Sequence, residues 1–139
     1  MPSRSIEQLH PDIRPLCYRF LATCKERGFD VLVTCTYRDT AEQDALYTIG
    51  RTLPGRRVTN ARGGQSLHNI TVGGVPASRA FDVVPLRLGK PVWGTTGVDL
   101  ALWQRIGEIG QACGLEWAGA WTRFREFPHF QLREKLRQA

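Results

Sequence analysis

The order of helix-forming and strand-forming segments constrains the fold of this chain more than any other feature of its sequence. Apolar residues recur every three or four positions from Ile13 to Cys24 and again from Leu102 to Ala112, as on the buried face of a helix. Segments typical of strands, some of them interrupted, lie at 30–36, 66–86, 115–117 and 129–132. The order of these elements predicts a single α+β domain with segregated elements rather than a doubly wound parallel sheet.

Capping signals indicate where the helices begin and end. Pro11 is suited to the first turn of the first helix, and Gly28 to the position after its last turn. A short helix is predicted over 40–47, with Asp39 or the residue after it as the N-cap. Asp99 is the predicted N-cap of the last long helix. The first helix has one apolar stripe, so we interpret it as part of the scaffold.

The extended segments differ in character. Residues 30–36 are rich in β-branched side chains and predict a buried strand. Residues 51–65 are polar, rich in arginine and glycine, and contain a proline, which predicts a loop. The pair Gly73-Gly74 lies between short apolar runs and predicts the tip of a protruding hairpin.

The composition is that of one globular domain. The chain has 139 residues, of which 42% are hydrophobic and 23% charged, which argues against disorder and fibrous repeats. We expect one domain over 1–139, with flexible ends at 1–10 and 133–139. Lysine and arginine number 19 and acidic residues 13, a net charge of +6. This charge favours contact with nucleic acid, an anionic membrane surface or the anionic polymers of a bacterial envelope, without choosing among them.

Membrane and redox signals are weak in this sequence. No stretch approaches the roughly 20 apolar residues of a membrane-spanning helix, and residues 1–7 have no apolar core of a secretory signal. We therefore expect the product to accumulate in the cytoplasm. The four cysteines form no CxxC pair and none neighbours a histidine, so we expect buried thiols, no disulfides and no cysteine-bound metal.

Two histidines and an unusual carboxylate are the candidate metal ligands. Asp82 is a lone acid within an apolar extended run, and buried carboxylates are normally paired with arginine, hydrogen-bonded or bound to metal. His68 and His129 lie in polar surroundings, whereas we interpret His10 as a surface or capping residue. Two imidazoles and one carboxylate suffice for a catalytic zinc, and Glu126 is a candidate for accepting a proton. No HExxH motif fixes their geometry, so structural roles remain open on this evidence.

Four segments, in order, resemble those of a known enzyme family. Cys35–Arg51 resembles the "YRS..EQ..LY..GR" segment of zinc peptidoglycan peptidases, and 58–69 their "VT.A..G.S.HN" segment. Ala80–Asp82 resembles "G.A.D", and 115–131 resembles "F.WGG.W..F.D.PHF". The match covers about residues 12–132. The family is that of VanY-type D-alanyl-D-alanine carboxypeptidases, and the similarity is greatest to phage endolysins that are L-alanyl-D-glutamate endopeptidases.

The resemblance implies a fold and a metal site. The fold is a Hedgehog/DD-peptidase-like α+β domain, with a small, mainly antiparallel sheet and helices packed on it. His68, Asp82 and His129 take the places of the three ligands of one Zn²⁺ ion. Glu126 takes the place of the catalytic aspartate and would exchange protons with the attacking water and the leaving amine.

Further positions match residues around the family's cleft. Arg38 matches an arginine that stabilises the polarised carbonyl oxygen or a substrate carboxylate. A simple salt bridge from Arg38 to Asp39 or Asp82 is the structural alternative. Gln43 and Ser66 match positions that shape the cleft, and Trp121 is the tryptophan that we expect in its wall. We therefore treat Gln43, Ser66 and Trp121 as candidate substrate-binding residues.

The sequence departs from the family pattern at several points. His68 and Asp82 are separated by a longer segment than is usual, with 69–76 as an inserted hairpin that is expected to border the cleft and alter selectivity. Ser78 stands where the family has glycine, and Glu126 where it has aspartate. Ala120 replaces an acidic residue found in many relatives. General-base chemistry survives the exchange of aspartate for glutamate in principle.

The function that we expect from the resemblance is zinc-dependent cleavage of the L-Ala–D-Glu bond in bacterial peptidoglycan by a phage or prophage endolysin. Such an enzyme would wait in the host cytoplasm for holin-mediated release, as a monomer without stable membrane insertion or nucleic-acid binding. A D,D-carboxypeptidase or dipeptidase of the same fold is the first alternative. A non-catalytic zinc module, like Hedgehog signalling domains, is the second, and nucleic-acid binding has only the charge in its favour.

Overall fold

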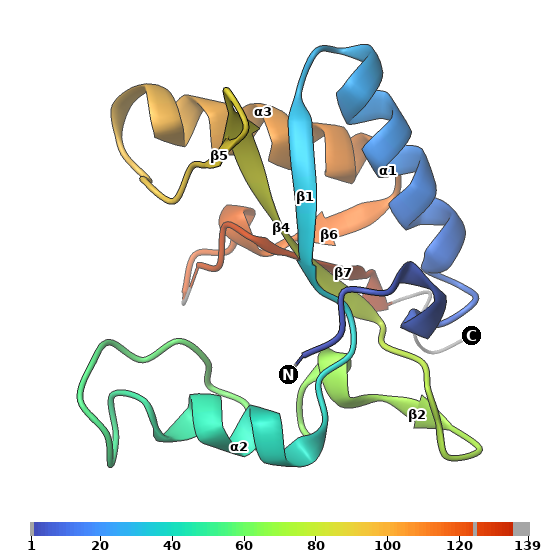
Figure 1. The fold of residues 1–139 in the computed structure, drawn as a ribbon, viewed down its shortest axis with the longest axis vertical. Coiled ribbons are helices and arrows are strands. Elements are labelled where there is room, and N and C mark those ends of the chain that lie inside the picture. Colours follow the sequence, from blue (N-terminus) through green and yellow to red (C-terminus); the bar gives the residue numbers. More distant parts are fainter. Residues whose placement is uncertain (1, 124, 135–139) are drawn as a thin grey trace.

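An antiparallel sheet built around one long strand, β4 (Ala80–Arg87), organises the fold in the computed structural model (Figure 1), which describes residues 2–123 and 125–134. The sheet order is β1-β4-β7-β6, and β5 pairs with the C-terminal end of β4. The other strands of this sheet are β1 (Asp30–Cys35), β5 (Lys90–Pro91), β6 (Leu115–Trp117) and β7 (His129–Leu132). A separate hairpin pairs β2 (Thr71–Val72) with β3 (Val75–Pro76).

The described residues also form three α-helices and three short 3-10 turns. Two helices, α1 (Arg14–Glu26) and α3 (Gly97–Ala112), pack on the sheet, whereas α2 (Thr40–Thr48) lies apart from it (Figure 1). The 3-10 turns are η1 (Ile6–Gln8), η2 (Leu67–Asn69) and η3 (Ala118–Ala120). The fold is thus the α+β type expected, with a mainly antiparallel sheet.

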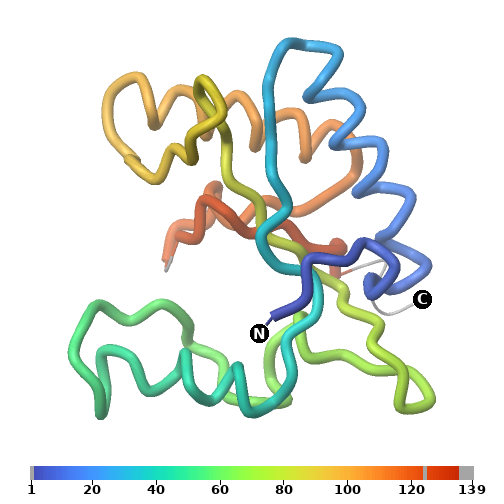
Figure 2. Tube along the Cα trace, viewed as in Figure 1, coloured from blue at the N-terminus to red at the C-terminus, as the bar shows by residue number. Residues whose placement is uncertain are grey.

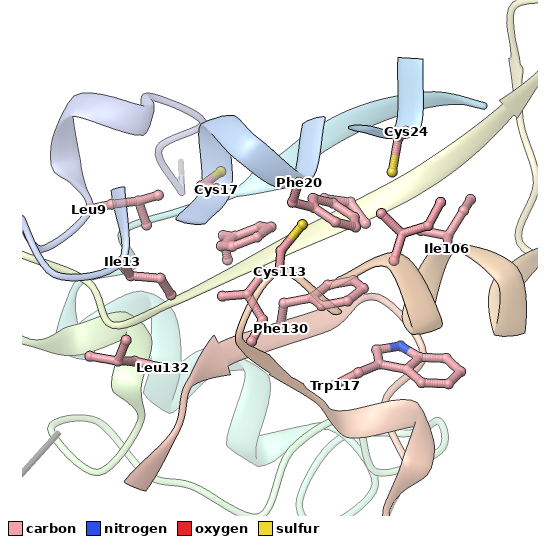
Figure 3. Packing of buried hydrophobic residues seen from close by; sticks show 14 of the residues in the cluster. Leu9, Ile13, Cys17, Phe20, Cys24, Ile106, Cys113, Trp117, Phe130 and Leu132 are labelled. Carbon is pink, nitrogen blue, oxygen red and sulfur yellow. The ribbon is translucent and has the colours of Figure 1, made fainter. Parts of the chain in front are cut away.

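The hydrophobic core lies between the two long helices and the sheet (Figure 3). Phe20 of α1 packs on Phe130 of β7, with ring centroids 4.7 Å apart, and the ring of Phe81 of β4 lies 5.7 Å from that of Phe130. The side chains of all three residues are fully buried. This cluster buries one face of β4 and β7, so the polar side chains at alternate positions must face the other way.

Two glycines let α3 approach the sheet closely. A Cβ atom on Gly107 would lie 2.3 Å from the ring of Trp117, and one on Gly110 would lie 2.3 Å from the ring of Phe130. Both distances are far below van der Waals contact, so a side chain at either position would push the helix away from β6 and β7.

The chain between β1 and β4 forms the other half of the molecule. In Figure 2 it runs through α2 and the long loop that follows, below the body made by the sheet and the two long helices. Among the described residues, none from 36 to 79 belongs to the hydrophobic core cluster. This half is therefore attached to the sheet mainly by polar contacts, several of which converge on the candidate site.

Local sequence signals were correct for several elements. The predicted first helix, the helix capped by Asp39 and the strands at 115–117 and 129–132 are confirmed. Asp39 and Glu42 form the reciprocal capping box. Gly73 and Gly74, both with positive φ, form the tip of the predicted hairpin.

Two predictions about the elements were wrong. The strand at 30–36 is not buried: β1 is an edge strand, and the side chain of Leu32 is 39% exposed. The last long helix begins at Gly97 with Thr96 as its N-cap, so Asp99 is not the cap. Asp99 instead lies in the first turn of the helix, where its carboxylate pairs with Arg87 at 2.9 Å.

The N-terminal segment, expected above to be flexible, is fastened to the fold. Backbone hydrogen bonds join Ser3 to Thr36 and Tyr37, and Leu9 is completely buried. At the other end, 135–139 lie outside the described residues. No helix in the described part of the chain is both long and apolar enough to span a membrane.

Candidate metal centre and active site

Strand register brings two of the candidate ligands together. Asp82 near the start of β4 pairs directly with His129 at the start of β7. Directly paired residues of antiparallel strands project from the same face. The turn η2 brings His68 to this face. Asp82 Oδ1 lies 3.2 Å from His68 Nε2 and 3.1 Å from His129 Nδ1, and the two nitrogens are 3.3 Å apart.

These three atoms have the spacing that one metal ion requires. Zinc binds histidine nitrogen and carboxylate oxygen at about 2.0–2.2 Å, so two ligand atoms of a tetrahedral site lie roughly 3.3 Å apart. The observed separations of 3.1–3.3 Å match this spacing. His68, Asp82 and His129 could therefore hold one zinc ion, which corresponds to the ligand set expected from the sequence.

The outer nitrogen of each histidine is held by a neighbouring acceptor. Nδ1 of His68 donates to the backbone oxygen of Thr36 at 2.8 Å, and Nε2 of His129 donates to Oε1 of Gln131 at 2.8 Å. The lone pairs of the inner nitrogens are then available for a metal, an arrangement that orients ligands and fixes their tautomers. Sequence reasoning missed Gln131, although a glutamine two positions after His129 shares its face of the strand.

Charges around the site depend strongly on Asp82. Burial opposes ionisation of Asp82, but the charges and hydrogen bonds of His68 and His129 outweigh this effect and hold the pKa of its carboxyl well below the usual range. For His129, burial opposes the charged form, yet the hydrogen bond and charge of Asp82 raise the pKa of the imidazole overall. Asp82 is thus held in its charged form, which is the form of a carboxylate that binds a metal.

Cys35, one of the four cysteines expected to be buried thiols, is a further neighbour of the candidate ligands. It pairs with Asp82 in the β1–β4 register, and one ligand atom each from Cys35, His68 and Asp82 lie within 4.8 Å of one another. Burial raises the pKa of the Cys35 thiol to about 11, so this thiol is protonated at neutral pH. Its sulfur lies 3.7 Å from Nδ1 of His68, the nitrogen occupied by Thr36, and the set with His129 is more closely spaced.

Arg38 lies next to the candidate ligands and is hydrogen-bonded to Gln43. Its Nη1 donates to Oε1 of Gln43 at 2.7 Å, and its Nη2 lies 3.5 Å from Oδ2 of Asp82. Gln43 is completely buried and donates to the backbone oxygen of Ala61 at 2.7 Å. Gln43 therefore connects Arg38 to the loop after α2 and does not itself line the cavity.

The Arg38 side chain has one donor without a partner among the described residues and also reaches the cavity. Its Nε is buried and, within the described part of the chain, has no hydrogen-bond partner. Arg38 also lines the cavity beside the ligands. The guanidinium therefore places a cation at the cavity wall, where it can stabilise negative charge on a substrate oxygen.

Glu126 and Trp121 belong to the segment between η3 and β7. Burial raises the pKa of the Glu126 carboxyl, the charge of Asp82 adds to this effect, and His129 and Arg38 oppose it. The indole of Trp121 donates to Glu116 at 2.9 Å and its ring lies 6.0 Å from that of His129. Glu126 and Trp121 both line the cavity.

A cavity of about 960 Å³ lies over the ligands. The loop segment 57–61, Ser66, Arg123 and Arg125 contribute to its wall, whereas none of the described residues that line it belongs to the hairpin at 69–76. The expectation that this hairpin borders the cleft is therefore wrong. Ser66 also accepts a hydrogen bond from the backbone N–H of His68 at 3.1 Å, so it fixes the turn that carries this ligand.

Two departures from the family pattern are accommodated locally. Ser78 is completely buried, and its hydroxyl donates to the backbone oxygen of Ala80 at 2.5 Å. The base of the inserted hairpin is closed by a backbone hydrogen bond in which Ala77 N–H donates to the oxygen of Ile70 at 2.8 Å. Neither change disturbs the spacing between His68 and Asp82.

Comparison with known proteins places this geometry in a family. Residues 59–132 match the Peptidase M15 family model described as D-alanyl-D-alanine carboxypeptidase. The chain is 34% identical over 128 residues to the peptidoglycan L-alanyl-D-glutamate endopeptidase CwlK of Bacillus subtilis, covering 89% of this chain and 73% of CwlK.

Solved structures support the fold. The L-Ala D-Glu endopeptidase ChiX of Serratia marcescens aligns with a TM-score of 0.68 and 21% identity, covering 100% of this chain and 93% of ChiX. The LD-carboxypeptidase LdcB aligns with a TM-score of 0.62 and 16% identity, over 89% of this chain and 58% of LdcB. The family match and the identity with CwlK show that this chain belongs to the M15 peptidases and is a metallopeptidase.

Proposed function

We propose that this protein is a zinc-dependent endopeptidase that hydrolyses the L-Ala–D-Glu bond in the stem peptide of bacterial peptidoglycan. The observation that carries the proposal is the cluster of His68, Asp82 and His129, with ligand atoms 3.1–3.3 Å apart, in one cavity with Glu126. The names of CwlK and ChiX, both L-Ala–D-Glu endopeptidases, support this choice of bond.

Each residue has a role that follows from its position. A zinc ion held by His68, Asp82 and His129 would supply a Lewis acid for the peptide carbonyl and for the attacking water. Glu126 accepts the proton of that water and donates a proton to the leaving amine, as its position in the cavity wall allows. The raised pKa of the Glu126 carboxyl makes it a stronger base than an exposed glutamate.

Arg38 and its neighbours position the substrate. The Arg38 guanidinium stabilises negative charge on the carbonyl oxygen or a substrate carboxylate, and Gln43 holds it in place. Ser66 and Trp121 line the cavity and contact the bound peptide. Arg57, Arg123 and Arg125 also contribute to the cavity lining, so the site favours a peptide that carries carboxylates.

The products of sacculus digestion test this proposal. Purified protein loaded with zinc is incubated with peptidoglycan, and the released muropeptides are identified by mass spectrometry. The proposal predicts peptides that begin with D-Glu and glycan chains that retain L-Ala. Chelation should abolish the reaction and added Zn²⁺ should restore it, whereas undiminished cleavage in the presence of chelator would contradict a metal mechanism.

A D,D-carboxypeptidase is the second candidate. The description of the matching family model favours it, as does the Arg38 guanidinium in the cavity lining, which would suit a free C-terminal carboxylate. Release of free D-alanine, with the L-Ala–D-Glu bond intact, would identify this activity in the same digestion.

The biological setting that we propose is lysis of a bacterial host by a phage or prophage. The resemblance of the sequence motifs to those of phage endolysins supports this part of the proposal. Expression in a bacterial cytoplasm should leave cells intact until the inner membrane is permeabilised by a holin. Lysis without permeabilisation would argue against that route, and no lysis after permeabilisation would argue against the endolysin role.

A further inference from the structure

A second hollow adjoins the catalytic cavity at Trp93. This hollow has a volume of about 330 Å³ and is lined by the loop after β5 together with Arg87, Lys90 and Asp99. Trp93 lines both the hollow and the catalytic cavity, so the two meet at this residue. Its indole is 57% exposed, which is unusual for the largest apolar side chain.

The position of Trp93 is fixed by the buried Trp103. Its ring centroid lies 6.4 Å from that of Trp103, which is buried in the core. The indole of Trp103 donates to the backbone oxygen of Gly94 at 2.9 Å and anchors the residue after Trp93. Trp93 is therefore a supported aromatic surface and not a side chain displaced from the core.

Polar groups beside Trp93 provide both donors and acceptors. Arg87 and Asp99 form an ion pair of 2.9 Å at the edge of the hollow, and Lys90 adds a further cation. A Cβ atom on residue 94 would lie 2.3 Å from a carboxylate oxygen of Asp99, so a side chain there would displace this carboxylate. An aromatic face next to mixed donors and acceptors suits a ring that carries hydroxyl and amide groups on its edge and C–H groups on its face.

We infer that the hollow at Trp93 is a subsite for the amino-sugar chain of peptidoglycan, with the indole packed against a sugar ring. The inference rests on the proposed function, because the L-Ala of the stem peptide is joined by an amide bond to the lactyl group that the amino sugar carries. The bond after L-Ala is then one residue, roughly 3.5 Å of chain, from the sugar-bearing group. An L-Ala–D-Glu endopeptidase must therefore accommodate sugar next to its catalytic cavity, whereas a carboxypeptidase acting at the far end of the stem need not.

Two substrates that differ only in the sugar test the subsite. One is a stem peptide attached to its disaccharide, and the other is the same peptide without sugar, with its L-Ala nitrogen acylated so that both substrates are neutral there. Trp93→Ala should raise KM for the disaccharide-bearing substrate by about tenfold, with little change for the sugar-free peptide. Trp93→Tyr should recover most of the affinity, because an aromatic face remains. Leu88→Ala is the control: Leu88 is 97% exposed in the neighbouring turn and lines neither cavity.

A binding measurement complements the kinetics. The peptide-free disaccharide is titrated into the wild-type protein and the indole N–H signals of the tryptophans are followed by NMR, where the Trp93 signal should shift. An equal increase in KM for both substrates in Trp93→Ala, or no increase for either, would overturn the inference. Failure of the proposed function is a separate result, in which the wild-type protein leaves the L-Ala–D-Glu bond of both substrates uncut.

Discussion

Asp82 and His129 are direct partners across β4 and β7, and the carboxylate Oδ1 of Asp82 lies 3.1 Å from the imidazole Nδ1 of His129. Two metal-ligand candidates are therefore positioned by the hydrogen-bonded register of a sheet that is covered on its other face by the hydrophobic core. A site built on strands in this way is more rigid than one built on loops.

Substitutions at His68 and Glu126 should separate metal binding from catalysis. His68→Ala removes one of three ligands, so the purified protein should lose its zinc. Glu126→Ala removes no ligand and should retain one zinc per chain, with kcat reduced about 10²–10⁴-fold. Metal content is measured by mass spectrometry and turnover with muropeptides. His10→Ala serves as a histidine control outside the site, and zinc retained in His68→Ala would refute the ligand assignment.

The stability of the metal-free protein should decrease as pH rises from 6 to 8.5. Burial opposes the charged imidazole of His129, but Asp82 raises its pKa overall above the ordinary value of 6.5. A raised pKa in the folded state stabilises the protein below the pKa of the unfolded chain, and this contribution is lost as pH rises through the folded value. Thermal unfolding in the presence of chelator measures the effect, which His129→Gln should reduce.

Zinc uptake should show the opposite trend with pH. The proton on His129 must leave before a metal can bind, so the apparent zinc affinity should increase over the same range. A titration that gave the same affinity at both ends of this range would contradict the assignment of His129 as a ligand.

Gln43→Ala should weaken catalysis without removing the metal. The substitution leaves Nη1 of Arg38 and the backbone oxygen of Ala61 without the partners that lie 2.7 Å away. We expect kcat/KM to fall about tenfold and the free energy of unfolding to fall by about 1–3 kcal/mol. Gln104→Ala, an exposed glutamine of α3, is the matched control. Unchanged kcat/KM would show that Arg38 needs no support from Gln43.

Excision of the β2–β3 hairpin should leave activity intact. Ile70 and Ala77 are already joined by a backbone hydrogen bond of 2.8 Å, so one glycine can replace Thr71–Pro76 with little loop-closure cost. No hairpin residue is among the described residues that line the cavity, so zinc content and kcat/KM should stay within about twofold. Loss of turnover with zinc retained would mean that the hairpin contacts the substrate.

Sequence patterns predicted the elements whose bounds depend on local chemistry. Apolar periodicity located α1, and the capping residues Asp39 and Glu42 located α2. The exposure of β1 could not be predicted, because it depends on its edge position in the sheet. The role of Asp99 depends on its ion pair with Arg87 of β4. Local sequence does not reveal this pair, and Asp99 was therefore predicted to be an N-cap.

The candidate site was predictable in its chemistry and not in its geometry. Resemblance identified His68, Asp82 and His129 as a ligand set, but 61 positions separate the two histidines, and only the fold brings them together. Gln131 and Thr36, which hold the outer nitrogens of these histidines, depend on register and tertiary contact. Gln43 was expected at the substrate, whereas its complete burial makes it a support for Arg38.

None of the described residues from 36 to 79 belongs to the hydrophobic core cluster, so we expect this polar half of the molecule to open more easily than the helix-covered sheet. The helix-covered sheet carries Asp82 and His129, whereas His68 and Arg38 belong to the polar half. Segments with few buried apolar contacts open at lower free energy than the global transition. Local opening of this half would separate His68 from the other two ligands. A metal ion bound by all three residues would therefore also hold the polar half against the sheet.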